Sequence, residues 1–318
     1  MTGRDLLLDM LSYRRPAGSQ TERQFIERFI APTGAKPDGY GNYILRVGEW
    51  PVLWSAHTDT VHKQGGRQQV RVCGQTAMVP DGSNCLGADD GTGCWILLEM
   101  IRAGVEGLYV FHRAEETGCN GSRYIATHTP ELLDGIQAAI AFDRRGYDSI
   151  VTHQVGFRTA SDGFALSLSE ALGISSLQPD DGGIFTDTLE YAHLIPECTN
   201  VSVGYTGAHG QWESQDLAFA EELRDAVIRM DLTALAILRS PFDPLGPRGG
   251  GWWDEDPEVP ELGTDLGPDP EEWWWDDEDG FHYGEPELYR CDYCDAVSGD
   301  TYELSGGRVC GRCVEELV

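Results

Sequence analysis

Two adjacent carboxylates, Glu115 and Glu116, follow an apolar run that begins at Leu108. The run predicts a buried strand that delivers both side chains into a cleft. Neighbouring carboxylates repel each other, so this placement is costly unless a cation or a shared proton compensates. The pair therefore indicates a site that binds a cation or transfers protons.

Other ionisable residues also lie beside apolar runs or in glycine-flanked turns: His57, Asp59, Asp89, Asp90, Asp143 and His209. The elements that must position them alternate along the chain. Apolar runs predict strands over 42–47, 52–56, 68–72, 76–79, 138–142 and 199–203, besides the run from Leu108. Helical spacing predicts helices over 4–11, 21–30, 94–101, 122–127, 163–172, 186–193 and 217–238.

This alternation predicts an α/β fold, a three-layer sandwich around a mixed, largely parallel sheet. In such sheets, sites form where the strands end at their carboxyl edge. The ionisable residues fall at that edge, so we expect them to lie close together.

The ordered set resembles the co-catalytic dizinc exopeptidases, a superfamily that includes peptidase T, compact zinc aminopeptidases and carboxypeptidases of the acetylornithine deacetylase type. The resemblance covers residues 1–240. The matching motifs, in chain order, are His57-Thr58-Asp59, Gly87-Ala88-Asp89-Asp90, Glu115-Glu116, Asp143 and the late histidine His209.

The resemblance implies two zinc ions bridged by Asp89. His57 and Asp143 would complete the site of one ion, and Glu116 and His209 the site of the other. Two cations held close together lower the pKa of a shared water and polarise a scissile carbonyl. Asp90 is the rival of Asp89, and His153 and His193 are the rivals of His209.

The resemblance also gives roles to residues that would not bind metal. Glu115 would be the general base, and Asp59 would orient His57. The peptide between Asp89 and Asp90 would be cis. On an extended strand, Glu115 and Glu116 would point to opposite sides and meet water and metal separately.

Two further residues are candidates for substrate binding. Arg144 could bind a substrate carboxylate or offset local acidity, and Asp187 could lie near the substrate or cap a helix. Only 65 residues separate Asp143 from His209, too few for an inserted lid domain. This favours the compact aminopeptidase architecture. His62 and His112 are expected to be structural.

The composition changes after residue 240. From Pro241 to Arg290 the chain has 16 acidic residues, two arginines, eight prolines and five tryptophans. Such a segment cannot easily bury a core. We predict a flexible acidic linker over 241–287, between a catalytic domain at 1–240 and a small module at 288–318.

Two Cys-x-x-Cys pairs define this small module: Cys291, Cys294, Cys310 and Cys313. Their spacing matches a zinc ribbon, in which four thiolates bind one structural zinc ion. So short a segment cannot fold alone, and the metal would supply most of its folding free energy. The five other cysteines show no pairing pattern and are expected to be reduced.

The charge balance excludes several partners. With 53 acidic against 23 basic residues, the formal net charge is −30, which argues against nucleic-acid or anionic-membrane binding. No apolar run approaches a membrane span, and no secretory signal pattern is present, so we expect a cytoplasmic protein.

We therefore expect a zinc-dependent hydrolase of amide bonds, and we favour an aminopeptidase acting on short peptides. A deacylase of N-acyl amino acids or a carboxypeptidase would use the same chemistry. Two alternatives come from other classes. The chain could be an adaptor that binds a protein partner through its tail, or a glutaminyl-cyclase-like transferase with one zinc ion.

Overall fold

The computed structural model describes residues 2–80 and 82–242, together with the backbone of four short strands near the C-terminus. The chain forms two compact units, Met1–Asp254 and Glu255–Val318. No helix within the described residues is long and apolar enough to cross a membrane. The predicted boundaries at residues 240 and 287 stay predictions.

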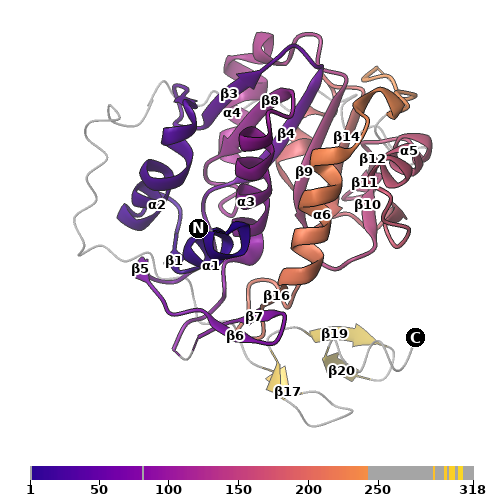
Figure 1. Ribbon diagram of the computed structural model, residues 1–318. Helices are drawn as coiled ribbons and strands as arrows, with labels where there is room; N and C mark the ends of the chain where they lie inside the picture. The colour runs from indigo at the N-terminus through magenta and orange to yellow at the C-terminus, as the bar shows by residue number, and fades with distance from the viewer. Residues whose placement is uncertain are drawn as a thin grey trace, which may run out of the picture. The chain divides into compact units, whose positions relative to one another are not determined.

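An eight-stranded mixed sheet forms the centre of the first unit (Figure 1). In spatial order its strands are β13 (Gln178–Asp180), β10 (Ser149–Val151), β14 (Glu197–Ser202), β9 (Ala138–Arg144), β4 (Val52–His57), β8 (Gly107–His112), β3 (Tyr43–Val47) and β2 (Lys36–Pro37). The central strands β14, β9, β4 and β8 run parallel, and the pairs β10–β14, β8–β3 and β3–β2 are antiparallel. The predicted mixed, largely parallel sheet is confirmed.

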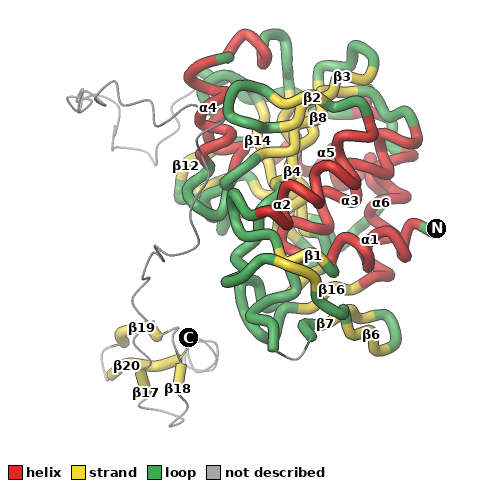
Figure 2. The backbone as a smooth tube through the Cα atoms, turned by 90° about the vertical axis from the view of Figure 1, so that its left-hand side faces the viewer, coloured by secondary structure: helices red, strands yellow, loops and turns green. Residues whose placement is uncertain are grey.

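Helices cover both faces of this sheet, as Figure 2 shows. One face carries α1 (Gly3–Leu11), α2 (Gln20–Phe25) with its π-helical extension Ile26–Ile30, α3 (Ala88–Ala103), α5 (Asp162–Leu172) and α6 (Leu217–Arg229). The other carries α4 (Asn120–His128) and the 3₁₀ helices η3 (Pro130–Leu133) and η4 (Asp187–Tyr191). Alternate residues of β4 pack to opposite faces, with Trp54 in the first core and Leu53 in the second. The three-layer sandwich is therefore confirmed.

A second, four-stranded sheet joins two hairpins that are distant in the sequence. Its order is β15 (Tyr205–Thr206), β16 (Ser214–Asp216), β7 (Thr76–Met78) and β6 (Arg71–Cys73). The β6–β7 hairpin was expected, although its first strand begins at Arg71 and not at residue 68. The loop 207–213 between β15 and β16 carries His209.

Two predicted helices differ from the structure. The segment 186–193 forms only the 3₁₀ helix η4, and the hydroxyl of Thr186 binds Asp143 instead of capping a helix. The helix expected over 217–238 ends at Arg229, because Met230 has extended backbone angles. Asp231 then caps a short 3₁₀ turn.

The second unit contains two antiparallel strand pairs. β17 (Tyr289–Arg290) pairs with β18 (Val297–Ser298), and β19 (Thr301–Leu304) pairs with β20 (Gly307–Cys310). Cys291, Cys294 and Cys313 lie outside the described residues, as does the acidic linker from residue 243 onward. The structural zinc site therefore stays a prediction. The five scattered cysteines are free thiols, as expected.

Candidate metal centre

The carboxyl ends of β4 and β9 bring two predicted ligands together. The strands are parallel neighbours, His57 is the last residue of β4, and Asp143 lies near the end of β9. The buried His57 Nε2 lies 3.5 Å from Asp143 Oδ1 and 3.2 Å from Asp89 Oδ1. The cluster thus lies at the carboxyl edge of the sheet, as expected.

Asp89, and not its neighbour Asp90, contacts both candidate histidines. Both aspartates have non-helical backbone angles in the first turn of α3, and the peptide between them is cis, as the resemblance implied. The Asp90 carboxylate instead accepts hydrogen bonds from the backbone N–H groups of His57 (3.0 Å) and Gly93 (2.9 Å). Asp90 therefore holds the strand end and the start of the helix.

His209 reaches the cluster from the loop 207–213. Its Nε2 lies 3.1 Å from Asp89 Oδ2 and 3.2 Å from Glu116 Oε2, while its side chain is 51% exposed. Among the described residues, neither His153 nor His193 belongs to a group of possible metal ligands.

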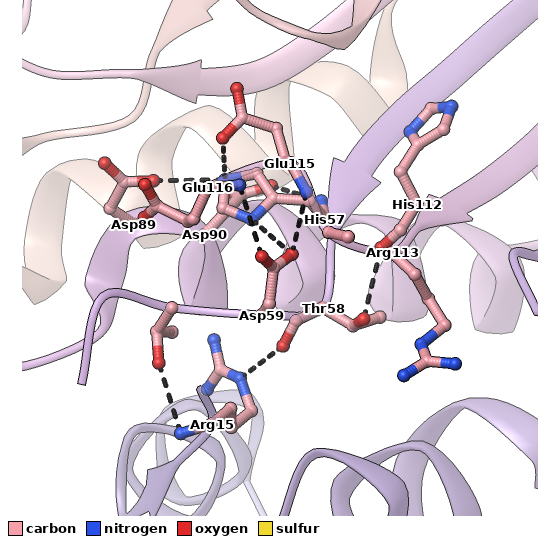
Figure 3. A network of polar contacts seen from close by, with 12 residues as sticks. Arg15, His57, Thr58, Asp59, Asp89, Asp90, His112, Arg113, Glu115 and Glu116 are labelled. Carbon is pink, nitrogen blue, oxygen red and sulfur yellow. Dashed lines mark hydrogen bonds and ion pairs between the residues drawn. The ribbon is translucent and has the colours of Figure 1, made fainter. Parts of the chain in front are cut away.

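The glutamate pair lies in a turn beyond the end of β8, where Ala114 has a φ of 59°. The buried Asp59 carboxylate accepts hydrogen bonds from the backbone N–H groups of Glu115 (3.1 Å) and Glu116 (3.2 Å), as Figure 3 shows. Asp59 Oδ1 also lies 3.5 Å from His57 Nδ1. The expectation of an extended strand with glutamates on opposite sides is wrong, because the turn presents both side chains to the cluster.

Three polar residues outside the predicted ligand set hold Asp143. Thr186 donates a hydrogen bond to Oδ2 (3.0 Å). Asn200 on β14 donates to the same oxygen (3.4 Å) and accepts from the Asp143 N–H (2.9 Å). The Tyr205 hydroxyl lies 2.7 Å from the Asp143 carbonyl oxygen and 3.1 Å from Asp89 Oδ2. No local signal marks these residues, because the fold brings them to Asp143 from later parts of the chain.

Glu213 is a further buried carboxylate that sequence reasoning missed. One of its oxygens accepts hydrogen bonds from the N–H groups of Leu86 (2.8 Å) and Gly87 (3.1 Å). The other accepts from Ala88 (2.7 Å) and Asp89 (3.1 Å). Its only sequence signal is that it closely follows the histidine of the same loop.

Buried oxygens without partners indicate that the cluster fits cations. Within the described part of the chain, Asp143 Oδ1 and Glu116 Oε1 are buried and have no hydrogen-bond partner. Burial and the charge of Asp89 raise the pKa of Asp143 to about 7, and burial raises the pKa of Glu115 well above its usual value. Bound cations would relieve this repulsion. Three groups have ligand atoms within 4.8 Å of one another: His57–Asp89–Asp143, His57–Glu115–Glu116 and Asp89–Glu116–His209.

The imidazoles are the countercharges of these carboxylates. Hydrogen bonds with Asp89 and Glu116 raise the pKa of His209 to about 11. Burial lowers the pKa of His57, but Glu115 and the other carboxylates outweigh it and raise that pKa well above its usual value. Imidazole nitrogen and carboxylate oxygen are ligands that zinc takes in catalytic sites. The residue types therefore fit zinc.

The two predicted substrate residues lie beside the cluster with partners of their own. Asp187 is buried, accepts a hydrogen bond from the Ser122 hydroxyl (2.6 Å) and lies 3.2 Å from His112 Nδ1. Arg144 donates a hydrogen bond to Asp180 (3.0 Å). Burial lowers the pKa of His112 to about 3, in keeping with its expected structural role. The substrate-binding roles of Asp187 and Arg144 stay predictions.

Comparisons with known proteins agree with this geometry. Residues 45–172 match peptidase family M28, and this span contains His57, Asp89, Glu116 and Asp143. No curated protein sequence matches the chain.

Solved structures share the fold. The aminopeptidase PepT of Bacillus cereus superposes with a TM-score of 0.59 at 13% identity, covering 72% of this chain and 98% of that one. A tripeptidase of Staphylococcus aureus gives a TM-score of 0.59 at 14% identity, covering 73% and 98%. The TET1 peptidase of Pyrococcus horikoshii gives 0.53 at 17% identity, covering 73% and 100%.

The M28 match over residues 45–172, together with the shared fold and the ligand cluster, supports the co-catalytic zinc exopeptidase superfamily for this domain. It is a metallopeptidase, a metal-dependent hydrolase.

Proposed function

We propose that the catalytic domain, residues 1–240, is an aminopeptidase that hydrolyses short peptides at a two-zinc site. The position of Asp89 is the observation that carries this proposal. Its Oδ1 lies 3.2 Å from His57 Nε2, and its Oδ2 lies 3.1 Å from His209 Nε2. One carboxylate thus contacts two imidazoles that belong to different ligand groups, as a ligand shared by two metal positions would.

The residues divide between two metal positions. His57, Asp143 and Asp89 would hold one zinc ion, and Glu116, His209 and Asp89 the other. When bound, the two ions lower the pKa of a shared water and polarise the scissile carbonyl.

Glu115 would act as the general base. Its Oε2 lies 3.8 Å from His57 Nε2, at the edge of the cluster, so it can accept a proton from water and pass it to the leaving amine. Asp59 would fix this geometry, since it holds the backbone of Glu115 and Glu116 and lies behind the imidazole of His57.

The open site favours an aminopeptidase over a deacylase or a carboxypeptidase. The residues between Asp143 and His209 form α5, η4 and strands of the central sheet, including β10, β13 and β14, and not an inserted domain. A free amine can therefore approach the carboxylates directly. The tripeptidase and PepT relatives support short peptides as substrates.

Peptide hydrolysis and zinc counting test the proposal together. The enzyme should release the N-terminal residue of a tripeptide and leave its N-acetylated form intact. Cleavage of the acetylated peptide, or of its C-terminal residue, would favour the deacylase or the carboxypeptidase. Elemental analysis should find three zinc ions in the full chain, two of them catalytic and one bound by the four tail cysteines. A full chain that holds a single zinc ion would contradict the two-metal site.

A further inference from the structure

Two side chains connect the loop 207–213 to the turn that carries Asp89. His209 contacts the Asp89 carboxylate at 3.1 Å. Glu213, at the other end of the loop, accepts a hydrogen bond from the Asp89 N–H, also at 3.1 Å. The loop therefore contacts both the side chain and the backbone of Asp89.

Glu213 makes the more extensive of the two contacts. It is 1% exposed, and its two oxygens accept four hydrogen bonds from consecutive N–H groups. Four bonds to one stretch of backbone fix both its position and its orientation. The connection continues along β16, where Gln215 Oε1 accepts a hydrogen bond of 2.6 Å from the Thr92 hydroxyl on α3.

The other metal position shares Asp89, but its two remaining ligands, His57 and Asp143, are held by other contacts. His57 is held by the backbone pairing of β4 and by the hydrogen bond from its N–H to Asp90. Asp143 is held by Thr186 and Asn200. Loosening the loop should therefore affect the two positions unequally.

We propose that Glu213 is a positioning residue that sets the distance between His209 and Asp89, and so determines how tightly the position formed by Asp89, Glu116 and His209 binds its metal ion. This inference rests on the proposed two-metal function. Without the four hydrogen bonds, an exposed loop has to be ordered by the metal itself, and that ordering lowers the affinity. Residues that orient metal ligands typically change affinity about 10–100-fold.

Cobalt(II) titration of the full-length chain tests the proposal. Visible absorption separates ions bound by nitrogen and oxygen from ions bound by tail thiolates. The unsubstituted chain should bind two ions at the cluster. Glu213→Gln should bind the first ion unchanged and the second about 10–100-fold more weakly. Glu213→Asp, which keeps the charge and some of the hydrogen bonds, should bind the second ion with an affinity between those of the unsubstituted chain and Glu213→Gln.

Asp216→Asn is the matched control, because Asp216 lies on the same hairpin but caps α6 through Ala218 and Phe219. It should bind both ions like the unsubstituted chain. The proposal would be overturned if Glu213→Gln bound both ions as tightly as the unsubstituted chain, or if it bound both ions equally more weakly. Loss of the circular dichroism of the folded chain in this variant would also overturn it. An unsubstituted chain that binds only one ion at the cluster would instead refute the two-metal function.

Discussion

The metal centre has two sides that are built differently. The strand side, His57 and Asp143, lies at the ends of two paired parallel strands and is almost fully buried. The loop side, Glu116 and His209, lies on a turn and on a hairpin loop, and the His209 side chain is half exposed. The parallel pairing of β4 and β9 brings the strand side together. The loop side depends on carboxylates that bind backbone N–H groups, Asp59 under the glutamates and Glu213 under the Asp89 turn.

The largest expected effect concerns Glu115, which belongs to neither side. Glu115→Ala should lower kcat by about 10²–10⁴-fold, the usual contribution of a general base. Its zinc content should stay the same, because neither proposed metal position uses Glu115. Steady-state kinetics and elemental analysis measure both quantities, with Glu27→Ala on an exposed position as the control. Turnover close to that of the control would remove Glu115 from the mechanism.

The stability of the metal-free chain should separate the two sides. His57→Ala removes a buried partner of several carboxylates and should cost about 3–5 kcal/mol of unfolding free energy. His209→Ala removes a half-exposed partner and should cost less than about 1 kcal/mol. Urea unfolding in the presence of a chelator measures both losses. Equal losses would show that the loop side is as much a part of the fold as the strand side.

A smaller effect should come from His62, as a pH dependence of the free energy of unfolding. Burial lowers the pKa of His62 to about 4, and its ring lies 2.7 Å from the Thr60 hydroxyl and 3.1 Å from the Cys85 carbonyl oxygen. Below the ordinary pKa of 6.5, the unfolded chain binds a proton that the folded chain does not. The folded state therefore loses stability as the pH falls from 6.5 towards 4.

At pH 5, relative to pH 7.5, this loss should be about 2 kcal/mol. His62→Gln should reduce the difference in unfolding free energy between these two pH values. An exposed histidine, His128, offers the control substitution His128→Gln. If this difference were the same in His62→Gln and in the control, the loss of stability in acid would come from other groups.

The strand side could be predicted from the sequence because buried parallel strands are continuous apolar runs. His57 and Asp143 directly follow such runs, and the parallel pairing of β4 and β9 brings them together. The choice of Asp89 over Asp90 came from the resemblance. Its physical basis, the bonds from Asp90 to the strand end and the helix start, is visible only in three dimensions.

The loop side shows why the rest could not be predicted. The left-handed Ala114 ends the extended run before the glutamates, and nothing in its residue type signals such a conformation. Thr186, Asn200 and Glu213 act across long stretches of chain, so their partners are not neighbours in the sequence. The same reason explains the wrong helix over 186–193, where the Thr186 hydroxyl serves a distant carboxylate.

The contact made by Glu213 has an evolutionary consequence. A carboxylate that recognises only backbone N–H groups places no demand on the side chains of the residues that it holds. Leu86 and Ala88 are therefore constrained by packing alone and can change as the core changes. A single residue on the hairpin can thus preserve the geometry of the turn while the side chains of the turn change.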